Sequence, residues 1–309
     1  MAKVLVTGGC GFIGSHIVEK LVERKFEIVV VDNLTTGKLS NIDLSLVDYY
    51  NCDINSRDFD KVVAKTMPQF IIHQAAQVSV PKSIKDIIYD TEVNIGGSIR
   101  VIEAAKNYGV KKIIFASTAA VYGEPQYLPV DTRHPVDPLS PYGLSKYTVE
   151  NYLKLAKSCY GLDYTILRYS NVYGPRQNAK GEGGVVAIFS GLLSQNQEVL
   201  IHGDGMQTRD FVYVEDVANA NLKALEKGSS SILNVATSTQ ITINDLFNTV
   251  KKYSNATVVP NFSDVRDGDI KHSVLCNKLT RDTLDWEVEY NIEEGINKTV
   301  NQYNGTVVV

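Results

Sequence analysis

The chain has 309 residues, of which 44% are hydrophobic, and a formal net charge of −4. This length and composition allow a full core, in one large domain or two closely associated ones. Lysine and arginine form no cluster, so we expect no nucleic-acid partner, whose binding needs clustered cations. No window approaches 18 uncharged apolar residues and no signal-peptide pattern opens the sequence, so we expect no membrane span and a cytoplasmic protein.

Short runs rich in β-branched residues alternate with amphipathic stretches in the first half of the chain. This alternation is typical of a parallel sheet with helices on both faces. We therefore predict an α/β fold, a Rossmann-type doubly wound parallel sheet, over 1–171. The pattern loosens afterwards, so we expect a smaller, partly interleaved domain over 172–309, with some later segments returning to the first domain. The predicted strands are 3–8, 27–32, 70–75, 111–117 and 164–170.

A glycine-rich segment, VTGGCGFIGSH, follows the first predicted strand and opens the first predicted helix. Its glycines are spaced G-x-x-G-x-x-G, which lets a pyrophosphate approach the bare backbone. Unpaired N–H groups at a helix N-terminus favour such an anion. The alternative is that the glycines serve tight packing alone. The backbone that would take part is that of Gly8, Gly11, Phe12, Ile13 and Gly14.

Asp32 ends the second predicted strand, 18 residues after Gly14. A carboxylate in this position accepts hydrogen bonds from the 2′-OH of an adenosine ribose and repels a 2′-phosphate. The segment therefore predicts a dinucleotide site that prefers NAD to NADP.

The four cysteines and five histidines are scattered, without C-x-x-C spacing. We expect reduced thiols, no disulfide framework and no metal site.

An amphipathic pattern predicts a helix over 143–160, closed by Gly161 as its C-cap. Apolar residues recur there at i, i+4, i+7 and i+11. The predicted buried face carries Val149, Leu153, Ala156 and Tyr160.

Tyr142 and Lys146, in the segment PYGLSK, are four residues apart at the start of this helix. That spacing puts both side chains on one face, with the ammonium near the phenol. A tyrosine is a poor base at neutral pH because its pKa is about 10, but a nearby positive charge favours the phenolate. The pair alone is also compatible with a solvated helix surface.

The motifs TGGCGFIG, VDNL, CDI, HQAA, STAAVYG and PYGLSK occur together, and RYSNVYGPRQ, GDGMQTRDFVYVEDVA and RDGDIKHS follow them. In this combination the chain resembles the extended short-chain dehydrogenase/reductases and, within them, the NAD-dependent UDP-glucose 4-epimerase group. The resemblance extends to about residue 285. It implies NAD that stays bound through the cycle, an NAD-binding first domain and a second domain that mainly binds the nucleotide sugar.

The resemblance implies cofactor contacts beyond the glycine-rich segment. Asp53 and Ile54 would flank the adenine, and the backbone of Ala75 and Ala76 would line the cofactor. Asn94 would order neighbouring strands. The remaining cofactor contacts would be made by Asn33, Tyr142 and Lys146.

Catalysis is implied for Thr118, Tyr142 and Lys146. Tyr142 would take the proton of the sugar 4-OH, assisted by Lys146 and the positive nicotinamide ring, while Thr118 would hydrogen-bond the same hydroxyl. A 4-keto sugar would form, turn over and be reduced from its other face, which inverts C4.

On the substrate side, Arg209 and Arg266 would bind the diphosphate and Asp269 the nucleoside. Ser273 occupies a slot that borders the sugar C2 substituent in these epimerases, and its small side chain leaves room for an acetamido group. We therefore expect UDP-glucose/UDP-galactose and UDP-N-acetylglucosamine/UDP-N-acetylgalactosamine to be interconverted. Asn171 would add a diphosphate contact. His202, in a slot often held by Phe, could stack on uracil; the alternative is that it has a structural role only.

Alternative functions are a reductase that releases NAD, a dehydratase of the same family, and a non-catalytic NAD sensor. A dehydratase needs an acid beside the catalytic threonine, where this chain has Ala119 and Ala120. A sensor has no need of all three catalytic residues. The resemblance also implies a homodimer, formed through helices at roughly 80–107 and 143–160.

Overall fold

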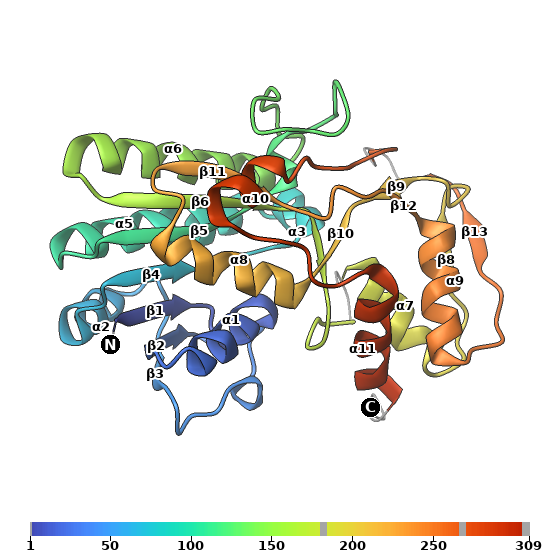
Figure 1. Ribbon diagram of the computed structural model, residues 1–309, viewed down its shortest axis with the longest axis horizontal. Helices are drawn as coiled ribbons and strands as arrows, with labels where there is room; N and C mark the ends of the chain where they lie inside the picture. The colour runs from blue at the N-terminus through green and yellow to red at the C-terminus, as the bar shows by residue number, and fades with distance from the viewer. Residues whose placement is uncertain (1, 180–183, 266–269, 305–309) are drawn as a thin grey trace.

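A seven-stranded parallel sheet forms the larger of two bodies in the computed structural model, which describes residues 2–179, 184–265 and 270–304 (Figure 1). The strand order is β11-β6-β5-β4-β1-β2-β3. Every neighbouring pair is parallel, which confirms the predicted doubly wound α/β fold. The strands are β1 (Lys3–Thr7), β2 (Glu27–Asp32), β3 (Asp48–Asn51), β4 (Phe70–His73), β5 (Lys112–Thr118), β6 (Asp163–Tyr169) and β11 (Ser231–Val235).

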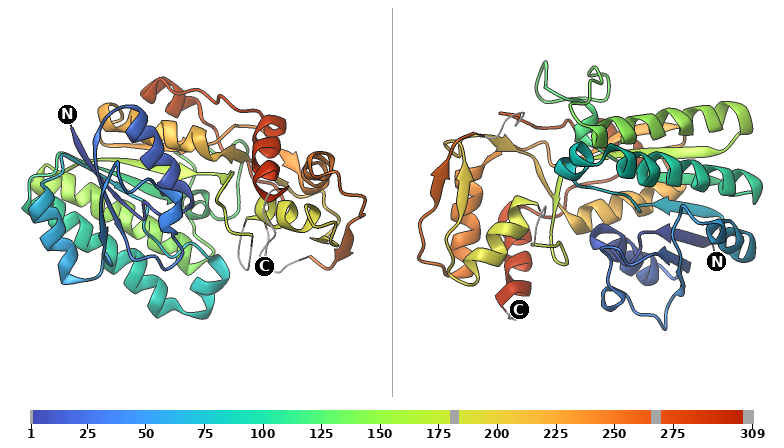
Figure 2. Two further views of the ribbon diagram at one scale, coloured as in Figure 1. Left: turned by 90° about the horizontal axis from the view of Figure 1, so that it is seen from below. Right: turned by 180° about the vertical axis from the view of Figure 1, so that it is seen from behind.

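Helices cover both faces of this sheet (Figure 2). Successive strand residues point to opposite faces, so Val4 and Val6 pack in one hydrophobic core and Leu5 in the other. The first core is completed by α1 (Phe12–Glu23), α8 (Val214–Glu226) and α10 (Lys278–Leu284); the second is completed by α2 (Arg57–Thr66), α5 (Gly97–Asn107) and α6 (Pro141–Tyr160).

Short helical segments connect the sheet to these helices. Between β4 and α5 lie α3 (Val80–Lys85), α4 (Ile87–Asp90) and the π-helical turn η2 (Thr91–Gly96); η1 (Leu39–Asn41) follows β2, and η3 (Ala119–Val121) follows β5.

The smaller body has its own hydrophobic core, in which Phe189 and Phe247 meet edge to face. It is built on α7 (Val185–Leu193), α9 (Ile243–Ser254) and α11 (Ile292–Asn304). Three strand pairs complete it: β7 (Asn171–Tyr173) with β10 (Phe211–Tyr213), β8 (Leu200–His202) with β13 (Asn261–Ser263), and β9 (Thr208–Arg209) with β12 (Ile241–Thr242).

The chain passes more than once between the two bodies. After β10 it returns to the larger body as α8 and β11, enters the smaller body again, and returns once more as α10. Trp286, just after α10, is buried in the larger core, and its indole N–H donates to the Asp216 carbonyl at 2.9 Å. None of the described helices is long and apolar enough to cross a membrane.

Two details of the predicted 143–160 helix need correction. The helix begins at Pro141, because Ser140 caps it by accepting a hydrogen bond from Gly143 N at 3.1 Å. Tyr160 was placed on the buried face but is 61% exposed, because it lies in the last turn, where its ring contacts Lys106 instead of the core. Gly161 is the C-cap with φ +74°, as predicted.

Candidate active site

The carboxyl ends of the parallel strands bring most cofactor-side residues together. Gly8 follows β1, Asp32 ends β2, Asp53 lies just beyond β3, Ala75 lies just beyond β4, and Thr118 ends β5. Because these strands are adjacent and parallel, their carboxyl ends lie along one edge of the sheet, where ligands bind in open α/β folds.

The glycine-rich segment is folded tightly against β4. Gly8 has φ +68°, and a Cβ there would lie 2.8 Å from Ala75 N. A Cβ on Gly14 would collide with the Gly8 carbonyl oxygen. Gly11 is less restricted, since its nearest neighbour would be the Gly8 oxygen at 3.2 Å. Gly8 and Gly14 are therefore needed for packing, whereas Gly11 leaves a bare backbone at the start of α1.

The N-terminus of α1 fits the diphosphate of a dinucleotide. Gly11 is its N-cap and provides no side-chain hydrogen bond, and the first turn contains no acidic residue. Phe12 and Ile13 begin the helix and are partly exposed. An uncapped helix start with a bare glycine backbone presents N–H donors and the positive end of the dipole to an anion.

Asp32 joins β2 to the glycine-rich segment. Its Oδ2 accepts a hydrogen bond from Cys10 N at 2.9 Å, and its Oδ1 accepts one from Leu34 N at 2.8 Å. Each oxygen can accept a further bond, as a ribose hydroxyl would require. Asn33 Nδ2 donates to Asp53 Oδ2 at 2.8 Å, so these two exposed residues are adjacent at the same edge.

Ile54 and Ala76 lie at the same edge of the sheet. Ile54 is buried and fits closely over Gly97, where a Cβ would lie 2.6 Å from its Cδ1. Ala76 is partly exposed beyond β4. Ile54 therefore has a packing role whatever it contributes to an adenine site.

Asn94 was expected to order neighbouring strands, but its side chain forms no hydrogen bond to a strand among the described residues. It lies in η2, and its amide holds the loop after β4: Oδ1 accepts from Gln77 N at 2.9 Å and Nδ2 donates to Gln77 O at 3.0 Å. Nδ2 also donates to Ser145 Oγ at 3.2 Å. Asn94 thus connects the cofactor edge to α6.

Tyr142 and Thr118 are brought together by the first turn of α6. Their side chains are close enough to interact, because Thr118 acts to lower the pKa of Tyr142. The Tyr142 N–H donates to Ser83 Oγ at 3.1 Å, which fixes the helix start against α3. Thr118 Oγ1 accepts from Ala120 N at 3.1 Å and so caps η3.

Lys146, one turn after Tyr142 on α6, is buried. Its Nζ donates to the Ala116 carbonyl at 2.9 Å and lies 5.0 Å from the centre of the Phe115 ring. Burial lowers the pKa of Lys146 to about 8. The ammonium is therefore held at the edge of β5 with donor capacity left for other groups.

The protein environment by itself raises the pKa of Tyr142. Burial raises it to about 12, against the opposing effect of Thr118. The expectation was that Lys146 and the positive nicotinamide ring together favour the phenolate, whereas burial acts on the phenol in the opposite direction. Further positive charge at the site is needed before the phenolate is favoured near neutral pH.

The substrate-side residues come from separate segments of the chain. Ser273 N donates to the Thr208 carbonyl at 3.1 Å, which places Ser273 beside Arg209 on β9. Asn171 N donates to the Asp210 carbonyl at 3.0 Å, one residue further along. Arg209, Ser273 and Asn171 are thereby gathered, while Arg266 and Asp269 lie outside the described residues.

His202 is tied to the same loop through its backbone. Its carbonyl accepts from Gln207 Nε2 at 2.7 Å, and its Nδ1 is 2.8 Å from Ser263 Oγ across the β8–β13 pair. The half-buried ring is therefore oriented by a serine, a contact that the sequence did not reveal.

Asp210 was not singled out from the sequence, although it follows Arg209 directly. It is buried, and its carboxylate accepts from Thr237 N at 2.8 Å, Ser238 N at 3.0 Å and Leu275 N at 3.3 Å. It therefore holds the segment after β11 and the segment after Ser273 beside β9. The sequence signal that could have identified Asp210 is its position between Arg209 and the apolar strand that follows.

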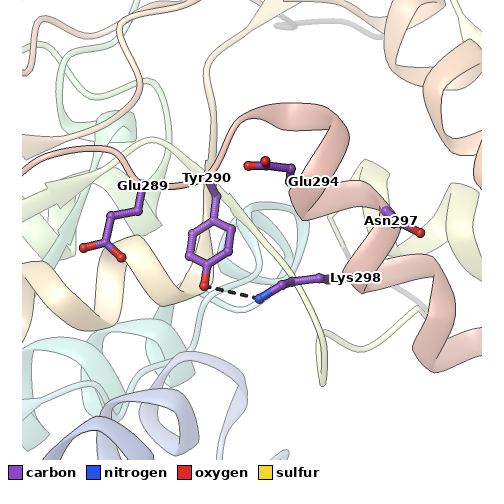
Figure 3. A pocket seen from close by; sticks show the side chains of 5 residues that line it. All are labelled: Glu289, Tyr290, Glu294, Asn297 and Lys298. Carbon is purple, nitrogen blue, oxygen red and sulfur yellow. Dashed lines mark hydrogen bonds between the residues drawn. The ribbon is translucent and has the colours of Figure 1, made fainter.

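A pocket of about 480 Å³ lies elsewhere, at α11 and the segment that precedes it (Figure 3). Lys298 on α11 points toward the Tyr290 hydroxyl and donates to it at 3.2 Å. The lining residues are Glu289, Tyr290, Glu294, Asn297 and Lys298, none of which is a predicted site residue. Within the described ranges, no three His, Cys, Asp or Glu side chains gather as metal ligands would.

The model of the NAD dependent epimerase/dehydratase family matches residues 4–236. The chain belongs to this family. The match confirms the predicted resemblance and an NAD-dependent enzyme, and it fits the uncapped helix start and the Asp32 carboxylate described above.

Individual relatives resemble the chain over nearly its whole length. A Methanocaldococcus jannaschii protein, provisionally named a UDP-glucose 4-epimerase, is 46% identical over 96% of this chain and 97% of its own. The UDP-glucose 4-epimerase of Thermotoga maritima, solved with UDP-glucose, has a TM-score of 0.95 and 41% identity, covering 97% and 98% of the two chains. The UDP-N-acetylglucosamine 4-epimerase of Methanobrevibacter ruminantium, solved with UDP-N-acetylmuramic acid, has a TM-score of 0.94 and 35% identity, covering 98% of each.

Proposed function

We propose that the protein is a UDP-sugar 4-epimerase that inverts C4 of UDP-hexoses with tightly bound NAD. The observation that carries the proposal is that Thr118 and Tyr142 are neighbours, together with buried Lys146, at the sheet edge where α1 begins uncapped. This edge offers a proton acceptor beside an anion-binding helix start. The relatives solved with UDP-sugars support the choice of substrate.

In the proposed mechanism, Tyr142 accepts the proton of the sugar 4-OH and Thr118 orients that hydroxyl. NAD, when bound, supplies the hydride acceptor for C4 and the hydride donor for the other face of the ketone. Lys146 favours the phenolate by its charge. The diphosphate must be held while the sugar turns over, and Arg209 and Asn171 are the described residues that we assign to this task, with Arg266.

A dehydratase is not favoured, because Ala119 and Ala120 occupy the turn directly after Thr118. Elimination of water needs a further acid or base there.

We assign the larger body to NAD and the smaller body, mainly residues 172–309, to the nucleotide sugar. A cytoplasmic location fits four cysteines that form no disulfide.

The experiment that tests the proposal is incubation of the purified protein with UDP-glucose and, separately, UDP-N-acetylglucosamine, followed by chromatographic separation of the products. We expect the C4 epimer and no net accumulation of NADH. Release of a reduced or dehydrated sugar would contradict the proposal in favour of a reductase or dehydratase. NAD binding without turnover of any UDP-sugar would favour a sensor.

We further propose a homodimer formed through an apolar face on α3, α4 and α6. Five of its side chains are each more than half exposed: Ile84, Ile87, Ile88, Leu144 and Leu155. The three helices pack against one another, and we assign these exposed side chains to one surface on them. Apolar surface of this extent favours burial against a second copy.

Light scattering after size-exclusion chromatography tests this assembly. We expect the wild-type mass to be twice that of the 34.1 kDa chain, and the double variant Ile88→Asp/Leu155→Asp to be monomeric. The control is Leu200→Asp, an exposed apolar residue of β8 outside this face, which should stay dimeric. A monomeric wild type would refute the dimer.

A further inference from the structure

Asp90, the last residue of α4, is a buried carboxylate with one unpaired oxygen. Only 1% of its surface is exposed. Its Oδ1 accepts hydrogen bonds from Gln77 Nε2 at 2.8 Å and from Asn94 Nδ2 at 3.0 Å. Its Oδ2 is buried and has no hydrogen-bond partner among the residues that the structure describes. Such an oxygen costs free energy, so its presence calls for a reason other than stability.

The charge of Asp90 acts on both Tyr142 and Lys146. Burial lowers the pKa of Lys146, and Asp90 opposes that change. Burial raises the pKa of Tyr142, and Asp90 adds to that rise. The groups are also linked through hydrogen bonds: Asn94 donates to Ser145 Oγ, which donates to the Tyr142 carbonyl at 2.9 Å. Asp90 is thus coupled to the catalytic pair by charge and by position.

Other titratable groups near this pair are neutral, paired or exposed. Burial lowers the pKa of His73 on β4 to about 3 and raises that of Tyr169 on β6 to about 12, so both are neutral between pH 5 and 10. Glu150 on α6 is paired with Arg168 at 2.5 Å. The charged residues of α3, α4, η2 and the link between α3 and α4 that face solvent are Lys82, Lys85, Asp86 and Glu92.

We propose that Asp90 is a positioning residue of the epimerase reaction, whose buried negative charge keeps Lys146 as the ammonium ion and Tyr142 as the neutral phenol until the oxidised cofactor adds its positive charge. This inference rests on the proposed function. It accounts for the unpaired Oδ2, because an oxygen without its own donor leaves more of the negative charge uncompensated toward its neighbours.

The Asp90→Asn variant isolates the charge. Oδ1 continues to accept from Gln77 and Asn94, and the amide NH2 replaces an oxygen that accepts nothing in the described structure. The shape and the hydrogen bonds are therefore kept. Asp90→Ser is a second neutral variant in case the amide does not fold.

The first measurement is the pKa of Tyr142 in NAD-saturated protein, followed by NMR of 13Cζ-labelled tyrosine. The Tyr142 resonance is assigned by its loss in Tyr142→Phe. We expect Asp90→Asn to lower this pKa by about one unit, the typical effect of a neighbouring charge. The control is Asp216→Asn, which neutralises another buried, hydrogen-bonded carboxylate and should leave Tyr142 unchanged. An unchanged Tyr142 pKa in the folded neutral variants overturns the proposal.

The second measurement is the pH profile of kcat for epimerisation. Loss of the charge lowers both pKa values, so both the acid limb set by Tyr142 and the alkaline limb set by Lys146 should move to lower pH. A purely structural role would lower kcat at every pH and leave both limbs in place, which would also overturn the proposal. The NMR titration needs no turnover, so failure of the proposed epimerase function is distinguishable from failure of this inference.

Discussion

Gly143 and the Ala120 carbonyl lie so close that a Cβ on Gly143 would be 2.5 Å from the carbonyl oxygen. Gly143 belongs to the first turn of α6 and Ala120 to η3, directly after Thr118. This contact lets the residue before Gly143 approach the residue that ends β5. The approach of Tyr142 to Thr118 therefore depends on the absence of a side chain at Gly143.

We predict that Gly143→Ala lowers epimerase turnover on the order of a hundredfold, because a displacement of this size disrupts catalytic geometry. The neighbour is backbone and cannot move aside cheaply. Gly161→Ala, at the other end of α6, is the control: it strains a positive φ but meets nothing within 4 Å, so it should reduce stability and preserve turnover. Normal kcat in Gly143→Ala would mean that the contact is not needed for catalysis.

Tyr142→Phe should lose at least about a hundredfold in turnover, the scale of a missing general base, while retaining its fold and bound NAD. Steady-state kinetics and the absorbance of the cofactor in the purified protein measure the two properties. Tyr160→Phe changes an exposed tyrosine of the same helix and should have wild-type kinetics. Near-normal turnover of Tyr142→Phe would remove Tyr142 from the mechanism.

Asp32→Ala should weaken the selectivity for NAD over NADP, since the carboxylate no longer repels a 2′-phosphate. Calorimetry on cofactor-free protein gives both dissociation constants. Asp32 also accepts hydrogen bonds from Cys10 N and Leu34 N, which Asp32→Ala would lose. The variant Asp32→Asn is therefore the closer comparison with the wild type, because it keeps an acceptor oxygen and loses only the charge. Tighter binding of NADP than NAD by the wild type would contradict the assignment.

Ser273→Tyr should lose turnover of UDP-N-acetylglucosamine selectively and keep activity on UDP-glucose, because the larger ring fills the space for an acetamido group. Ser273 is held beside β9 by its own backbone N–H, so the substitution leaves that bond intact. Kinetics on both sugar pairs, with Ser273→Ala as the small-residue control, measure the effect. A wild type that turns over neither N-acetylated sugar would refute the pocket assignment.

The titration of Lys112 should make the free energy of unfolding increase as the pH rises above about 8. Its buried Nζ donates to the Ala224 and Lys227 carbonyls at the end of α8, and burial lowers its pKa to about 8. The unfolded chain, with a lysine pKa of about 10.4, then binds more protons than the folded one between these values, so stability increases with pH. Urea unfolding from pH 7 to 10 should show this rise in wild type relative to Lys112→Met; parallel curves would refute it.

Local pattern was sufficient for the glycine-rich segment and for placing Tyr142 and Lys146 on one face of a helix, although that helix begins two residues earlier than predicted. The Gly8–Gly14 spacing, Asp32 and the pair Tyr142 and Lys146 follow from short-range rules: strand then helix, a turn that excludes a Cβ, and a four-residue period. The same rules located five of the seven strands of the main sheet. The direction of each side chain along a helix or strand depends on the backbone of that element. The sequence of one segment is therefore enough to predict which of its side chains share a face.

Tertiary structure decided the rest, because pairing and burial join distant segments. β3 is a short polar strand, and β11 enters the sheet only after an excursion through the smaller body, so neither has a strong local signal. Burial raises the pKa of Tyr142, which spacing to Lys146 could not show. The carboxylates of Asp90 and Asp210 acquire their roles only because several distant segments of the chain surround them. The free energy of a buried charge depends on all the groups that replace its water, and these groups come from different parts of the sequence.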